Sequence, residues 1–100
     1  MCKTRVFNEI LEAVSAETEV SADCILSGKK DEETVDARYM LVHLLSRSGI
    51  SHSSIAKLIN KNVRTVNHIV TGFEARMSSR KMFGINLEQI KKALGNKLFS

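Results

Sequence analysis

Side chains that can hydrogen-bond to the edges of nucleic-acid bases recur at helical spacing in the second half of the chain. Four of them stand at i, i+3, i+4 and i+7, so a helix places them on one face: Arg64, Asn67, His68 and Thr71. Arginine donates to guanine O6 and N7, asparagine pairs with adenine N6 and N7, and threonine contacts the thymine methyl group. The pattern predicts a helix face that reads base pairs in a DNA groove.

The same segment carries an apolar stripe on roughly the opposite side of that helix. Its members follow i, i+3, i+4, i+7 and i+11: Val66, Ile69, Val70, Phe73 and Met77. Solvated helix faces more often carry Glu and Lys, whereas Glu74 is the only acidic residue from Lys57 to Lys81. The segment is therefore expected to pack its stripe on a core and to present the polar face to a ligand.

The residues before this helix fit the first half of a helix-turn-helix, which we place at about residues 53–77. Two helices that cross over a tight turn need a small residue where they approach most closely, and Ala56 supplies it. Ile55 and Ile59 supply the buried side, and Asn60 stands at the turn, where positive φ favours Gly or Asn. A purely structural helical hairpin remains the alternative interpretation.

Charge is distributed unevenly along the sequence. Residues 1–50 carry six Lys/Arg against nine Asp/Glu, a net charge of −3, whereas residues 51–100 carry nine against two, a net charge of +7. A basic half is where a polyanion binds, and Lys57 and Lys61 are expected to contact phosphates. Asn62 and Thr65, at the start of the reading helix, complete this expected contact region.

Neither catalysis nor metal binding is predicted. Cys2 and Cys24 are interpreted as free thiols, and no Cys-x-x-Cys or His-x-x-x-His spacing presents two ligands from one element. His43 is interpreted as a surface or half-buried structural histidine. The serines at 51, 53 and 54 are typical of helix N-caps. No enzyme activity, cofactor or metal is expected.

Composition favours a single all-α domain over residues 1–100. The chain is 43% hydrophobic and has no Pro, and its apolar residues recur at helical rather than alternating spacing. Helices are predicted over about 3–16, in a short turn through Leu26, from a cap at Asp31 or Thr34 to about Ser48, and from Asn86 through Leu98. No signal peptide or membrane-spanning run is recognisable, so a cytoplasmic location is expected.

Arg38 is the residue that fits the central helix least well. A helical wheel places it between apolar neighbours, where a charge needs either a partner or an external anion. The helix around it, rich in Leu, Val and Met, is expected to be the most buried of the domain.

The order of these features resembles the C-terminal DNA-binding domain of the bacterial replication initiator DnaA, from about Thr4 to Leu98. The resemblance is carried by three stretches: Val20–Lys30, Val35–Met40, and Ile55-Ala56 with Thr65-Val66 and His68. It implies an all-α domain that binds double-stranded DNA, in replication or transcription. The ATPase loop Gly-x-x-x-x-Gly-Lys-Ser/Thr is absent from these residues.

The resemblance also adds contact residues outside the helix-turn-helix. By position, Lys30 replaces a basic-loop arginine of the family, Arg38 is its long-helix arginine, and Thr65 falls on a DNA-contacting threonine. Lys61-Asn62-Val63-Arg64 departs from the family's Arg-Asp-His-Ser/Thr signature, so the docking mode is carried over and the target sequence is not. A helical protein-interaction module that has lost DNA reading is the alternative function, for which the acidic run after Lys30 gives a reason.

Overall fold

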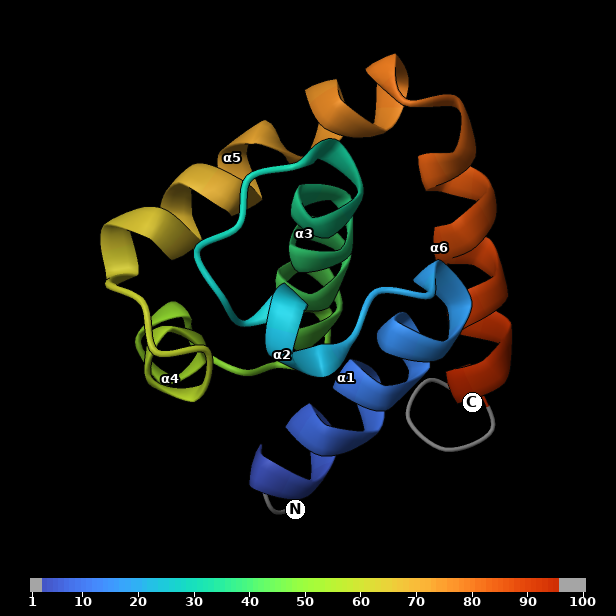
Figure 1. Ribbon diagram of the computed structural model, residues 1–100. Helices are drawn as coiled ribbons and strands as arrows, with labels where there is room; N and C mark the ends of the chain where they lie inside the picture. Colours follow the sequence, from blue (N-terminus) through green and yellow to red (C-terminus); the bar gives the residue numbers. More distant parts are fainter. Residues whose placement is uncertain (1–2, 96–100) are drawn as a thin grey trace.

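The computed structural model describes residues 3–95 and confirms the all-α fold class. Within this range the chain forms six helices: α1 (Lys3–Thr18), α2 (Ala22–Ile25), α3 (Glu32–Arg47), α4 (His52–Leu58), α5 (Val63–Ser79) and α6 (Lys81–Leu94). Figure 1 shows α3 inside a ring made by the other helices. None of the helices in residues 3–95 is both long and apolar enough to cross a membrane. Cys2 and Leu98 lie outside the described residues.

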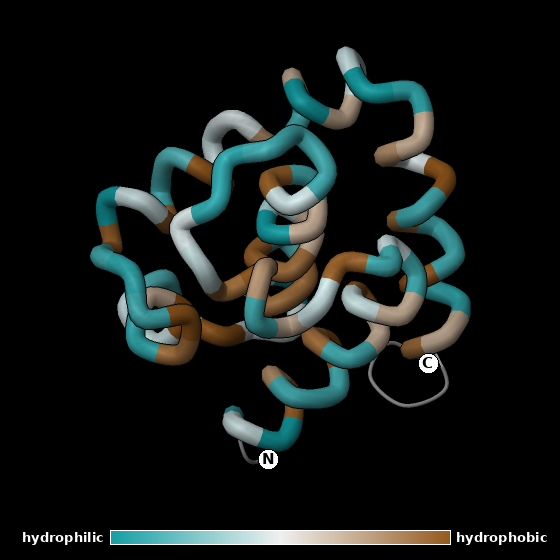
Figure 2. The backbone as a smooth tube through the Cα atoms, viewed as in Figure 1, coloured by the Kyte–Doolittle hydropathy of each residue, from teal (hydrophilic) through white to brown (hydrophobic). Residues whose placement is uncertain are grey.

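Helix α3 is the central element, as its apolar sequence predicts. It packs against α1, α2, α4 and α5, and its buried residues include Met40, Leu41, Leu44 and Leu45. The hydropathy colouring of Figure 2 shows apolar residues on this helix at the centre of the molecule. Since α3 packs against both α5 and α2, it fixes where α5 and the loop after α2 lie relative to each other.

Four helices begin with the same capping chemistry. The side chain of the N-cap residue accepts a hydrogen bond from the backbone N–H three residues later in α2, α3, α4 and α5: Ser21, Asp31, Ser51 and Asn62. Asp31, rather than Thr34, is the cap of α3, and the hydrogen bonds from Thr34 lower the pKa of the Asp31 carboxyl. These caps set the first residue of each helix.

The start of the last helix was predicted wrongly. Helix α6 begins at Lys81, not Asn86, and it includes Gly84. The buried stripe starts at Phe83 and continues through Leu87, Ile90 and Leu94. Glycine costs a helix interior about 1 kcal/mol, but burying a phenylalanine side chain contributes about 2–3 kcal/mol, so packing outweighs the local preference.

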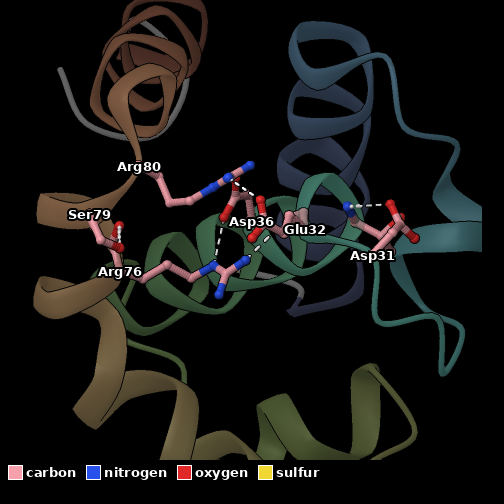
Figure 3. A network of polar contacts seen from close by, with 7 residues as sticks. Asp31, Glu32, Asp36, Arg76, Ser79 and Arg80 are labelled. Carbon is pink, nitrogen blue, oxygen red and sulfur yellow. Dashed lines mark hydrogen bonds and ion pairs between the residues drawn. The ribbon is translucent and has the colours of Figure 1, made fainter.

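An ion-pair network joins α3 to the corner between α5 and α6. Asp36, 8% exposed, accepts from Arg76 Nε at 2.6 Å and from Arg80 Nε at 2.8 Å, and Glu32 also pairs with Arg80. Figure 3 shows the Asp36 carboxylate between the two guanidinium groups. The guanidinium of Arg76 also lies 5.2 Å from the centre of the Tyr39 ring. Two positive charges of the basic half are thus neutralised by acidic residues of the other half.

Candidate nucleic-acid interface

Residues at the α4–α5 turn have the backbone conformation and the burial that their types predict. Asn60 adopts φ 57°, and the backbone N–H of Lys61 donates to the carbonyl of Ala56 at 2.9 Å, which closes the turn between the helices. The five residues predicted to face the shared core are all buried: Ile55, Ala56, Ile59, Val66 and Ile69. The turn between α4 and α5 therefore rests on a small residue, an asparagine at positive φ and buried apolar residues on both helices.

Helix α5 separates into a buried and an exposed face. Val66, Ile69 and Phe73 are buried, and Val70 and Met77 pack against the core at its edge. The four side chains predicted to read bases are all exposed: Arg64, Asn67, His68 and Thr71. A helix face of about two turns that carries hydrogen-bonding side chains is therefore exposed at the molecular surface.

A cleft of about 330 Å³ lies between α5, α3 and the loop that follows α2. Half of the expected contact residues line it, from three segments of the chain: Lys30, Arg38, Lys61, Thr65 and His68. Ser27, Gly28 and Tyr39 complete much of its wall. The fold therefore places the loop lysine next to the first turn of α5, although 31 positions separate Lys30 from Lys61 in the sequence.

Arg38 has internal partners and needs no external anion. Its side chain is 9% exposed, and Nε donates to the carbonyl of Ile25 at 2.8 Å. Its Nη2 donates to three further carbonyls, of Cys24, Ser27 and Lys29, at 3.4, 2.7 and 3.1 Å. Burial lowers the pKa of its guanidinium. These hydrogen bonds give Arg38 a structural role, because they hold the loop that carries Lys30.

Asn62 and Thr65 are partly occupied by each other. Asn62 Oδ1 accepts from the backbone N–H of Thr65 at 2.8 Å and from its hydroxyl at 3.0 Å. These bonds begin α5 and use the oxygen of Asn62 and the hydroxyl hydrogen of Thr65. A ligand can still receive a hydrogen bond from the Asn62 Nδ2 and donate one to the Thr65 hydroxyl oxygen.

The cations around this surface have no acidic partners. Lys30, Lys57 and Arg64 are exposed and Lys61 is half-buried, and between residues 3 and 95 none of the ion pairs involves any of them. Arg76 and Arg80, by contrast, are engaged with Asp36 and Glu32. The free positive charge of this region is therefore concentrated at the α4–α5 turn and the neighbouring loop.

His52 is a functional candidate that sequence reasoning missed. It is the first residue of α4, and its Nδ1 lies 2.7 Å from Asn67 Oδ1 on α5. The two residues are 15 positions apart, and their meeting depends on the angle between the helices, which no local pattern encodes. The only sequence signal for this contact was that both residues are polar.

The other histidine of interest, His43, is structural. Its ring stacks on Phe73 with centroids 3.8 Å apart, and burial, with Lys91 and Arg47 nearby, lowers the pKa of His43 to about 4. It is thus neutral at physiological pH, as a packing residue should be. The portion of the chain from Lys3 to Gly95 holds no group of three or more His, Cys, Asp or Glu side chains placed to bind a metal ion.

Comparison with known protein families, with characterised proteins and with solved structures finds no match to this chain. The resemblance to the DnaA domain therefore rests on the sequence features given above, and it stays a prediction. The candidate interface therefore rests on the positions of this chain's own residues.

Proposed function

We propose that this protein binds double-stranded DNA, with α4 and α5 acting as a helix-turn-helix and α5 as its reading helix. The observation that carries the proposal is the exposed face of α5, where Arg64, Asn67, His68 and Thr71 lie together beside cations that have no acidic partner. No acidic residue occurs from His52 to Phe73. A surface of this kind suits a polyanion whose base edges offer both donors and acceptors.

The proposed docking places the first turns of α5 in the major groove, which is wide enough for an α-helix. Arg64 and His68 face base edges, and Thr71 lies one turn further along the same face. Lys57 on α4 and Lys61 in the turn contact phosphates on one side of the groove. These contacts give affinity and register, whereas the α5 side chains give sequence preference.

The loop after α2 forms the second contact region of the proposal. Lys30 is exposed at the rim of the cleft and reaches the backbone beside the groove occupied by α5. Arg38 acts indirectly, because its hydrogen bonds to the carbonyls of Ser27 and Lys29 hold this loop in place. The DnaA-like order of the elements supports a role in replication or transcription, and the target sequence is left to experiment.

Fluorescence anisotropy with duplexes selected from a random library tests this function. Replacing Arg64 with Ala should weaken binding to the selected duplex by about 1–3 kcal/mol, because a bidentate contact to a base is lost. Lys92→Ala, which removes an exposed cation of α6, is the matched control and should bind like the parent. Equal losses from both variants would contradict reading by α5.

The alternative function, a helical protein-interaction module, has one observation in its favour. Met82 and Ile85 on α6 are 56% and 51% exposed, on the helix at the far end of the molecule from the α4–α5 turn. If this protein binds no duplex DNA at low salt, DNA binding is excluded and the protein-interaction module is favoured.

A further inference from the structure

One outward-facing side chain of α5 is tied to α4. Asn67 Oδ1 lies 2.7 Å from Nδ1 of His52, a hydrogen bond that spans the turn of the α4–α5 pair. Arg64, His68 and Thr71, which share the exposed face, make no side-chain hydrogen bond to other residues of the 3–95 segment. Asn67 is therefore held in one orientation, whereas its neighbours are free to adapt to a ligand.

The chemistry of the pair fixes which atom carries the hydrogen. An amide oxygen can only accept, so Nδ1 of His52 must be the donor, and neutral His52 must be the Nδ1–H tautomer. A 2.7 Å separation is at the short end of the range for N–H···O bonds. The amide of Asn67 then turns its oxygen toward α4 and its Nδ2 away from α4.

This orientation changes what Asn67 can read. Adenine recognition by asparagine uses both amide atoms: the oxygen accepts from N6 and the nitrogen donates to N7. The bond from His52 uses one of the two lone pairs of this oxygen, so Asn67 can still use both atoms, but only in the orientation that the bond fixes. We infer that His52 is a positioning residue that holds the amide of Asn67 ready to pair with adenine, so that one position of the target prefers A over G.

The inference rests on the proposed DNA binding, but its first test does not require DNA. Long-range proton–nitrogen NMR spectra of the histidine side chains report the tautomer in the free protein, at a pH where the imidazole is neutral. We expect His52 to be the Nδ1–H form and to change to the Nε2–H form in Asn67→Ala. An Nε2–H form in the parent protein would overturn the inference whatever the protein binds.

The second test compares base preferences among duplexes selected from a fully randomised library. The parent should show one position at which A is enriched over G, and Asn67→Ala should lose the preference there. His52→Ala leaves the amide free to rotate, so the preference for A over G should fall by about tenfold at that position alone. His52→Gln retains an N–H donor and should keep the preference for A.

The outcomes separate the two proposals. Enrichment of no duplex by the parent protein would contradict DNA binding itself. Enrichment with a base preference that His52→Ala leaves unchanged at every position would overturn the role of His52 and leave DNA binding intact. A merely structural His52 would weaken binding to all duplexes alike and would not change the preference at one base. Thermal unfolding of each variant checks that the fold is retained.

Discussion

At the residue scale, the structure separates side chains that hold the α4–α5 region together from those that are exposed on its surface. Arg38 shows the difficulty, because an arginine among apolar neighbours fits both an anion contact and an internal role. Its four hydrogen bonds to carbonyls of residues 24–29 decide for the internal role. Those acceptors are backbone atoms of an irregular loop, and residue types do not encode where such atoms lie. The sequence therefore indicates that Arg38 needs a partner, but it does not show which partner.

His43 carries a prediction about pH. Its pKa of about 4 in the folded state lies below the ordinary value of 6.5, so the unfolded state binds more protons between these two values. Stability is thus unaffected above pH 6.5 and falls as the pH drops toward 4. Allowing for partial solvent exposure, the loss at pH 5 should be about 1–2 kcal/mol.

Urea unfolding at pH 7 and pH 5 measures this loss. His43→Phe keeps the stacked ring on Phe73 and removes the titrating group, so it should lose less stability over the same interval. An identical pH dependence in the parent and in His43→Phe would show that other groups cause the acid sensitivity.

At the scale of the elements, periodicity identified the helices better than it identified their ends. The stripe of α5 and the apolar circumference of α3 were visible in the sequence because both helices bury residues at regular spacing. The start of α6 was predicted at Asn86. Glycine at position 84 locally disfavours a helix, whereas the burial of Phe83 keeps the residues before Asn86 in it. Where α6 begins thus depends on the burial of Phe83 in the core, which local sequence patterns do not reveal.

Gly84 gives a prediction at this scale. A Cβ at Gly84 would meet no atom within 4 Å, and the residue lies in α6 without a positive φ. Gly84→Ala should therefore stabilise the protein by about 0.5–1 kcal/mol, because alanine favours helix and restricts the unfolded chain.

Gly49→Ala is the matched control for this change. Gly49 also has open space around it, but its φ is 90°, which alanine tolerates poorly. The control should be destabilised, as measured by urea unfolding. Equal effects of the two substitutions would mean that the backbone conformation of Gly84 or Gly49 is not as described.

At the scale of the whole molecule, the fold pairs some basic residues of the second half of the sequence with acidic residues of the first half. Arg76 and Arg80 belong to the basic half, yet Asp36 and Glu32 of the acidic half neutralise them. The free cations that remain near the α4–α5 pair come from two distant segments, the loop at Lys30 and residues 57–64. Sequence reasoning found these residues through spacing and resemblance, but the cleft that joins them depends on how α3 packs.

The salt dependence of duplex binding tests the central claim most directly. If Lys30, Lys57 and Lys61 each contact a phosphate, the logarithm of the association constant should fall against the logarithm of salt concentration with a slope of about −3. Lys61→Ala should reduce the size of that slope by about 1, and Lys92→Ala should leave it unchanged. A slope near zero, or one altered by Lys92→Ala and not by Lys61→Ala, would contradict DNA binding by this surface.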